Sequence, residues 1–301
     1  GLGDVYKRQG DTMLDRGVAQ RSLSDPYYPF ERFRSDDGSY FRGQEYVVLN
    51  LEGAITTVRR PPEKSYDFAF DPAYADILAE IGVDAVTLAN NHAFDQGMAG
   101  FLDTEQALEG AGIEWFHDSK TGDITPRIAY LGDSAERVAF VGLNVSDGRY
   151  DAGRAEDLIR EAHAHASHTI AYVHWGEEYS VTPNVAQRAI AHQLVDFGAD
   201  AVIGAHPHVV QPIEIYGNAP VVYSLGNFVF DQDFSPKTTE GLAVKLTFSE
   251  EEDSLELFPL SIIRSQPEFL SGAARDAKLR ELADISDASL RDQIREGMIG
   301  W

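Results

Sequence analysis

The chain has 301 residues, of which 43% are hydrophobic and 11% aromatic, so it can bury a core large enough for one large domain or two small ones. Asp and Glu outnumber Lys and Arg by 49 to 25, and the formal charge of −24 argues against nucleic acid as a partner. There is no cysteine, which excludes disulfides and thiolate metal sites, so any metal ion must be held by His, Asp, Glu or Asn.

The first nine residues, GLGDVYKRQ, resemble translated sequencing-adapter sequence of the kind found at the ends of metagenomic reading frames. We therefore expect residues 1–9 to be an artefact, and we expect the natural start, with any signal or anchor and the first strand, to be missing. No apolar run approaches the roughly 20 residues that span a bilayer, so the chain as given is predicted to be soluble. The natural location stays open.

From Glu45 onward, strand-like and helix-like segments alternate, which predicts an α/β domain. Strands are expected at 45–52, 83–89, 137–144, 168–176 and 199–206, where short apolar runs end in polar residues. Helices are expected at 71–82, 97–112 and 184–198, each of which ends at a glycine.

The second half of the chain changes character. Strand-like segments at 212–217, 219–230, 241–248 and 254–264 follow one another with only turns between them, which predicts antiparallel strands. The acidic cluster at 250–253 is interpreted as a solvated turn. After about Gln266 the chain becomes polar, and residues 266–301 are expected to form a helical surface tail. The domain itself is expected to span residues 10–265.

Five strand-like segments end in polar clusters: GDTMLDRG, NLEG, ANNHAFDQG, VHWGEEY and GAHPHVVQP. Because the carboxyl ends of parallel strands lie along one edge of a sheet, these clusters are expected to converge on one site. For each cluster taken singly, turn formation is the alternative, since Asn, Asp and Gly also end strands.

Three histidines lie at strand ends in positions that favour metal binding. His206 and His208 flank Pro207, and alternation along a strand would point both imidazoles to one side. His174 ends another strand beside Gly176, which allows close backbone approach. A single histidine in such a place is more often structural, but three beside carboxylates favour a metal site. Five other histidines are interpreted as surface or packing residues: His117, His163, His165, His168 and His192.

Oxygen donors at the remaining strand ends could complete this metal site. They are Asp11, Glu52 and Asn91. A mixed nitrogen and oxygen donor set without sulfur suits Mn²⁺, Fe²⁺ or Zn²⁺ better than Ca²⁺. Each short motif taken alone also occurs as an ordinary turn.

Together, the segments GDTMLDR, NLEGAIT, TLANNHAFDQG, HWGEEY, GAHPHVVQPIEIY and VVYSLGNFVF resemble the motif series of the bacterial capsule synthesis protein CapA family, which is associated with poly-γ-glutamate synthesis. The resemblance runs from about Gly10 to about Arg264, in family order and spacing. The family itself is similar to calcineurin-like metallophosphatases. It implies an α/β fold in which two sheets of mixed parallel and antiparallel strands form a sandwich flanked by helices.

The resemblance also implies roles for individual residues. His92 matches the general acid of the metallophosphatase Gly-Asn-His motif, and Glu52 stands where a bridging carboxylate would lie. The full set of implied ligands is Asp11, Glu52, Asn91, His174, His206 and His208.

The sequence departs from the phosphatase pattern at two positions. Met13 stands where a phosphatase has a histidine ligand, and Glu52 stands where a phosphatase has Asp. The centre is therefore expected to hold one or two divalent ions, and one well-held ion with a second weak or absent is an alternative to a full two-metal centre.

Two further residues could support catalysis. Arg16 could bind an anionic phosphate or carboxylate with two guanidinium nitrogens, or could form an ordinary surface salt bridge. Asp95 could orient His92 as a hydrogen-bond acceptor, or could cap the helix that begins near Gly97. Asn90 is expected to form the turn.

Three functions are open on these grounds. The favoured one is metal-dependent hydrolysis of a phosphoester or a glutamyl amide bond. The second is metal-dependent epimerisation at the α-carbon of a peptide residue. The third is a non-catalytic role in a capsule-polymer synthesis or export complex, with membrane proteins of that complex as partners. The expected substrate is an anionic small molecule, a peptide or polyglutamate, and the resemblance implies a membrane-associated or extracytoplasmic role.

Overall fold

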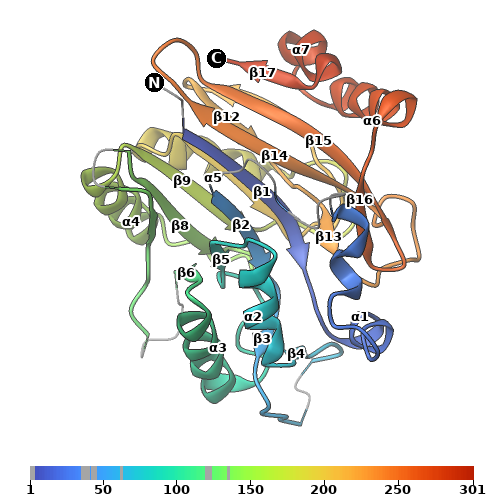
Figure 1. Ribbon diagram of the computed structural model, residues 1–301. Helices are drawn as coiled ribbons and strands as arrows, with labels where there is room; N and C mark the ends of the chain where they lie inside the picture. Colours follow the sequence, from blue (N-terminus) through green and yellow to red (C-terminus); the bar gives the residue numbers. More distant parts are fainter. Residues whose placement is uncertain (1–3, 35–40, 42–45, 62–63, 119–123, 134–135) are drawn as a thin grey trace.

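The computed structural model describes residues 4–34, 41, 46–61, 64–118, 124–133 and 136–301. In this part of the chain two β-sheets lie face to face, and helices cover the outer face of each sheet (Figure 1). The fold is therefore the two-sheet αββα sandwich with mixed parallel and antiparallel strands that the sequence predicts.

The larger sheet is parallel at its centre and antiparallel toward the C-terminus. Its strands are β1 (Asp4–Thr12), β2 (Tyr46–Leu51), β5 (Ala85–Thr87), β6 (Glu114–Phe116), β13 (Asn227–Val229), β14 (Glu240–Phe248), β15 (Ser254–Ile263), β16 (Gln266–Phe269) and β17 (Met298–Gly300). They follow the order β16-β15-β14-β1-β2-β5-β6, with β13 beside β1 and β17 beside β15. Strands β1, β2, β5 and β6 pair in parallel, whereas β14, β15 and β16 pair antiparallel.

The smaller sheet has a parallel centre with one antiparallel strand at each edge. Its strands are β7 (Ala129–Leu131), β8 (Val138–Asn144), β9 (His168–His174), β10 (Ala201–Ala205), β11 (Ile213–Tyr216) and β12 (Ala219–Val222), in the order β11-β12-β10-β9-β8-β7. Two short strands, β3 (Ala54–Ile55) and β4 (Ala69–Phe70), pair separately. Because β1, β2, β5, β8, β9 and β10 all belong to parallel pairs, their carboxyl ends gather at one end of the sandwich.

The helices lie on the two outer faces and connect the parallel strands. They are α1 (Arg16–Arg21), the 3₁₀ helix η1 (Tyr28–Phe33), α2 (Ala73–Glu80), α3 (Gly97–Ala111), α4 (Ala152–His165) and α5 (Val185–Phe197). Helix α5 begins at a capping box of Asn184 and Gln187 and ends at Gly198 in the left-handed conformation. Among the described residues, the structure has no helix with the length and apolarity that a membrane crossing needs.

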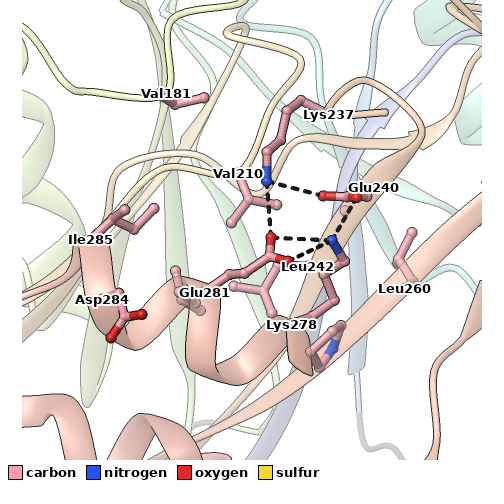
Figure 2. Close-up of a pocket in the computed structure, with 13 residues that line it drawn as sticks. Val181, Val210, Lys237, Glu240, Leu242, Leu260, Lys278, Glu281, Asp284 and Ile285 are labelled. Carbon is pink, nitrogen blue, oxygen red and sulfur yellow. Dashed lines mark hydrogen bonds and ion pairs between the residues drawn. The ribbon is translucent and has the colours of Figure 1, made fainter. Parts of the chain in front are cut away.

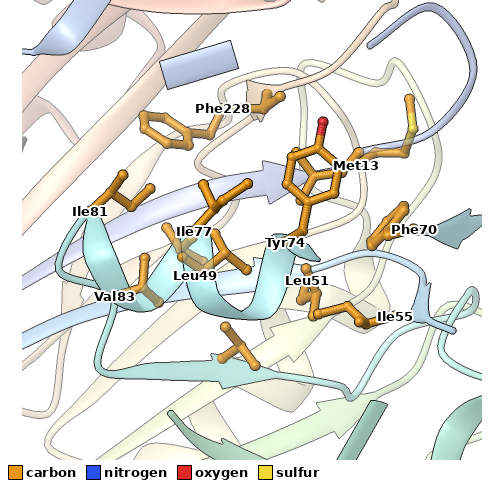
Figure 3. Packing of buried hydrophobic residues seen from close by; sticks show 14 of the residues in the cluster. Met13, Leu49, Leu51, Ile55, Phe70, Tyr74, Ile77, Ile81, Val83 and Phe228 are labelled. Atoms are coloured by element: carbon orange, nitrogen blue, oxygen red, sulfur yellow. The ribbon is translucent and has the colours of Figure 1, made fainter. Parts of the chain in front are cut away.

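Alternation along each strand sorts the side chains into layers. On β2, Val47 and Leu49 pack under α2 and α3, whereas Val48 packs between the sheets. Figure 3 shows Leu49 and other members of the helix-covered layer beside side chains of α2. The inner side chains of β9, Ile170 and Tyr172, belong to the layer between the sheets. The same alternation therefore turns the ends of β2 and β9 toward this inner space.

Residues 266–301 do not form the separate surface tail that the sequence predicts. They contain α6 (Gly272–Ile285), the 3₁₀ helix η2 (Ala288–Leu290) and α7 (Arg291–Glu296), but also β16 and β17, which both pair with β15. Leu279, Leu282 and Ile294 are buried in the layer between the sheets. The polar composition of this segment gave the wrong prediction. A few apolar side chains on one face of a helix are sufficient to bury that face, even when the rest of the segment is polar.

Strand β1 begins at Asp4, within residues 1–9, the segment that is expected to be an artefact. From Asp4 its backbone pairs with β2 and β14, with Tyr6 opposite Tyr46. A first strand that leads into Asp11 is thus present, although the sequence predicts that it is missing. Val and Tyr favour strands, and a sheet ladder needs only backbone groups to form. The origin of residues 1–9 stays a prediction.

Candidate metal centre

The six predicted ligands lie together at the carboxyl ends of the strands, between the two sheets. Three come from the larger sheet and three from the smaller one. Asp11 lies in β1, Glu52 follows β2, Asn91 follows β5, His174 ends β9, and His206 and His208 follow β10. The convergence expected from the strand-end clusters is therefore real.

The carboxylate of Glu52 is at the middle of this cluster. Its side chain has no exposed surface, and neither oxygen has a hydrogen-bond partner. The Nε2 atoms of His92, His174 and His208 lie 3.9, 3.9 and 3.8 Å from Oε1 of Glu52. Burial raises the pKa of Glu52 well above its usual range because the charged form loses its hydration. A buried carboxylate of this kind either takes up a proton or is stabilised in its charged form by a cation beside it.

Glu52, His206 and His208 fit a shared metal ion. One ligand atom from each lies within 4.8 Å of the others, and Nδ1 of His206 is buried without a hydrogen-bond partner. Burial lowers the pKa of His206 to about 4 and that of His174 to well below its usual value. These imidazoles are therefore neutral at pH 7 and offer lone pairs, as metal ligation requires. One carboxylate with imidazoles suits Mn²⁺, Fe²⁺ or Zn²⁺.

The hydrogen bonds of His208 fix which nitrogen faces the centre. Its Nδ1 lies 2.9 Å from Oδ1 of Asn227 and 3.2 Å from Oδ2 of Asp11. Because both partners accept, Nδ1 carries the proton and donates, which leaves Nε2 directed at Glu52. Burial lowers the pKa of His208, but the carboxylates of Glu52 and Asp11 outweigh it and raise the pKa to about 9. Without a cation Nε2 is therefore also protonated at pH 7, and a metal ion would bind there by displacing that proton.

The imidazoles of the His-Pro-His segment are directed at the centre by left-handed backbone conformations and not by strand alternation. Strand β10 ends at Ala205, and both His206 (φ 92°) and His208 (φ 57°) have left-handed backbones. The backbone N–H of His206 donates to Oδ2 of Asp11 at 3.2 Å. Such conformations cost about 1–3 kcal/mol each and persist where the surroundings determine them, commonly at functional sites. The expected alternation is therefore wrong, although its outcome, two imidazoles at one centre, is right.

Asn50 braces the centre and was not foreseen from the sequence. Its Nδ2 donates to Oδ1 of Asp11 at 2.7 Å and lies 3.3 Å from Nδ1 of His174, across the gap between the sheets. Its Oδ1 accepts from Asn90 at 3.1 Å. The signal was available, because Asn50 precedes Glu52 by two residues and so occupies the same face of the strand.

Asp95 orients His92. Nδ1 of His92 lies 2.6 Å from Oδ2 of Asp95, and that oxygen also accepts from the backbone N–H of Phe68 at 2.8 Å. Helix α3 is preceded by Gln96 and has no side-chain cap, so capping is not the role of Asp95. Asn90 accepts from the backbone N–H of His92 at 3.0 Å, which matches its predicted part in the turn.

Arg16 does not present its guanidinium to the centre. Its Nε donates to Oδ2 of Asp231 at 3.2 Å, and Nη2 donates to the other carboxylate oxygen. The predicted anion clamp is therefore occupied by Asp231, and the salt bridge that was the alternative is the one formed. Arg16 still lies near the site, since its guanidinium carbon is 5.2 Å from the ring of Phe68, which packs on His92.

Met13 and the other histidines lie apart from the cluster. Met13 is fully buried in the helix-covered layer (Figure 3). His117 is buried against Phe101, and His192 pairs with Glu214. Both fit the packing and surface roles predicted for them.

Two pockets differ in their relation to this centre. An apolar pocket of about 310 Å³ lies beside α6, where Leu242, Leu260 and Leu282 form its wall and Lys278 pairs with Glu240 at its rim (Figure 2). It contains none of the predicted ligands. A second pocket of about 320 Å³, most of whose lining residues are polar, has Asn91 and Asn144 in its wall. This second pocket borders the centre at Asn91.

The sequence model of the bacterial capsule synthesis protein PGA_cap matches residues 8–232, a range that contains all six predicted ligands. The chain belongs to this family. This PGA_cap chain is 29% identical over 281 residues to the PGA biosynthesis protein CapA of Bacillus subtilis (strain 168), covering 86% of this chain and 71% of that protein.

Two further similar proteins, one compared by sequence and one by structure, carry no information about function. The PGA_cap chain is 44% identical over 316 residues to the uncharacterized protein y4sH of Sinorhizobium fredii (strain NBRC 101917 / NGR234), covering 75% of this chain and 68% of that protein. A hypothetical protein of Thermus thermophilus has a solved structure with a TM-score of 0.48 and 18% identity, covering 87% of this chain and 95% of that chain. A TM-score below 0.5 does not bear on the function of this chain.

Proposed function

We propose that this PGA_cap protein is a metal-dependent hydrolase that cleaves a glutamyl amide or a phosphoester bond. The observation that carries the proposal is the buried carboxylate of Glu52, which lacks a hydrogen-bond partner and has three imidazole nitrogens within 4 Å. One of these imidazoles, that of His92, is held by a carboxylate of its own. A metal site next to an oriented proton donor is the arrangement that hydrolysis needs.

The residues present fit one or two divalent ions, with Mn²⁺, Fe²⁺ or Zn²⁺ favoured. Glu52, His206 and His208 would hold the first ion, and the remaining ligands would be His174 and Asn91, whose Nε2 and Oδ1 lie 2.7 Å apart. Asp11 would act chiefly by orienting His208. When bound, the ion would supply Lewis acidity to water and to a substrate oxygen.

His92 would protonate the leaving atom. Hydrolysis adds the hydroxyl of water to phosphorus or to the carbonyl carbon, breaks the bond to the leaving oxygen or nitrogen, and requires a proton on that leaving atom. With Nδ1 of His92 held by Asp95 at 2.6 Å, the Nε2 that faces the centre supplies this proton and later regains one from water. Arg16 would contribute only at the rim of the site.

The proposed substrate is a glutamyl amide bond of a polyglutamate chain, with a phosphoester as the second class. The name of the Bacillus subtilis relative, PGA biosynthesis protein CapA, supports the first class. By the same analogy, membrane proteins of a capsule synthesis complex would be its partners, and its place would be at the membrane or outside the cytoplasm. The net charge of −24 requires that a polyanion be drawn in locally, by the metal ion and nearby cations.

Elemental analysis of protein purified without chelator, coupled to a hydrolysis assay, tests the proposal. The probes are γ-glutamyl-p-nitroanilide, polyglutamate and bis(p-nitrophenyl) phosphate. We expect stoichiometric metal in the wild type, and loss of metal and turnover in His206→Ala. His192→Ala, which alters a histidine paired with Glu214 away from the centre, is the matched control and should keep both. Wild-type protein that holds no metal, even when Mn²⁺, Fe²⁺ and Zn²⁺ are resupplied, would refute the hydrolase and leave a non-catalytic role.

A further inference from the structure

Lys64 and His92, the proposed proton donor, bind the two oxygens of the same carboxylate, that of Asp95. Its Nζ lies 2.6 Å from Oδ1 of Asp95, while Oδ2 of the same carboxylate holds Nδ1 of His92, also at 2.6 Å. We infer that Lys64 is a positioning residue for His92 and acts through Asp95, an inference that rests on the proposed hydrolysis.

The two oxygens of Asp95 have separate partners. Oδ2 accepts from His92 and from the backbone N–H of Phe68, and Oδ1 accepts from Lys64. The ammonium of Lys64 also donates to the backbone carbonyl of Asn91. The carboxylate therefore cannot rotate without breaking contacts on both sides, and the ring of His92 keeps its Nε2 toward Glu52.

The charges around Asp95 give Lys64 a second effect. The carboxylate of Asp95 has no exposed side-chain surface, and its negative charge acts on Glu52, whose pKa it helps to raise. The side chain of Lys64 is 47% exposed, so its ammonium stays in contact with water while it pairs with Asp95 from the outside. The carboxylate of Asp95 can thus hold His92 while the ammonium of Lys64 compensates its negative charge in the protein interior.

Lys64 also lines the polar pocket beside Asn91. A role in binding substrate directly, or a purely structural role in holding the loop, would be compatible with some of the same contacts. The three roles differ in what they predict. Positioning of a proton donor affects kcat and depends on the leaving group, direct binding affects KM, and a structural role affects folding and metal content.

The test uses a pair of phosphate esters that differ in how much they need a proton donor. Phenyl phosphate has a poor leaving group, whereas p-nitrophenyl phosphate has a good one. For Lys64→Met we expect kcat on phenyl phosphate to fall by about 10- to 100-fold, the range for partners that orient a site residue. The fall on p-nitrophenyl phosphate should be smaller, and KM and bound metal should stay unchanged. Lys64→Arg should restore part of kcat.

A double-mutant cycle shows whether Lys64 acts through Asp95. In an Asp95→Asn background, Lys64→Met should cause little further loss, because the carboxylate through which it acts is already gone. Multiplicative losses would overturn the inference, as would a change confined to KM or equal losses on both esters. If Lys64→Met fails to fold, Lys64→Gln is measured in its place, and a loss of metal in a folded variant also counts against positioning.

Proton NMR of the purified protein separates this inference from the proposed function. The proton on Nδ1 of His92, held 2.6 Å from Asp95, should give a downfield resonance that is absent in His92→Gln. Lys64→Met should shift or broaden it. If wild-type protein hydrolyses none of the probes, the proposed function fails, yet this resonance still reports on Lys64. An unchanged resonance in Lys64→Met would overturn the inference by itself.

Discussion

Nε2 of His174 and Oδ1 of Asn91 lie 2.7 Å apart, although one residue ends a strand of the smaller sheet and the other follows a strand of the larger sheet. The two atoms belong to elements that only the packing of one sheet on the other brings together. A metal ion bound here would therefore tie the sheets to each other, and its binding would then be coupled to the stability of the fold.

Removal of metal should lower thermal stability. A ligand that binds only the folded state, at 100 times its Kd, stabilises it by about 2.7 kcal/mol, so chelation should lower Tm by a few degrees. Calorimetry with and without EDTA measures this. Glu52→Gln should abolish the difference, whereas an equal difference in this variant would place the metal elsewhere.

Asn91 and His92 are neighbours to which the proposed function gives separate roles. Asn91→Ala should lose metal, because a ligand is removed. His92→Ala should keep its metal and lose about 10²- to 10⁴-fold in kcat, the usual contribution of a general acid. Elemental analysis and single-turnover assays of the two variants check the assignment, and the opposite pattern would reverse it.

Acid should destabilise the protein through His117. Burial lowers its pKa to about 4 in the folded state from an ordinary value of 6.5, so the unfolded chain binds more protons in between. The contribution of His117 is complete above pH 6.5 and falls by about 3 kcal/mol as the pH drops to 4. Urea unfolding of EDTA-treated protein across this window measures it, and His117→Leu should flatten the dependence. A variant that keeps the full slope would show that other groups cause it.

The C-terminal segment should contribute to global stability. Leu279 of α6 is fully buried between the sheets, so Leu279→Ala should cost about 2–5 kcal/mol. Leu23→Ala, at a leucine that is 88% exposed, is the matched control and should change stability by less than about 0.5 kcal/mol. Equal small effects would mean that the segment is the detached tail that composition suggests.

Several elements of the fold could be predicted because their signals are local. The helices α2, α3 and α5 lie within the predicted segments, since apolar spacing and a terminal glycine act over a few residues. The run of strands in the second half was predicted in part. Strands β11, β14 and β15 pair antiparallel as expected, but the predicted segment 219–230 divides into β12 and β13, which lie in different sheets and pair in parallel with β10 and β1. Residues 266–301 were not, because the burial of Leu279 depends on a surface supplied by distant strands.

Which residues could form a metal centre can be read from the amino-acid sequence alone. Asp11, Glu52, Asn91, His174, His206 and His208 stand at strand ends, and strand ends in parallel sheets share an edge. The prediction needs only the donor atoms of the side chains and the direction of the strands, and short segments of sequence indicate both.

How these residues are held depends on contacts that form only in the folded protein. The brace of Asn50, the ion pair that occupies Arg16, and the contact from Lys64 to Asp95 all join residues distant in the chain. The left-handed turn at His206 is likewise imposed by its surroundings, against the preference of the residue. The physical reason is that hydrogen bonds and burial depend on distances across the fold, and a sequence specifies those distances only once the two sheets have packed.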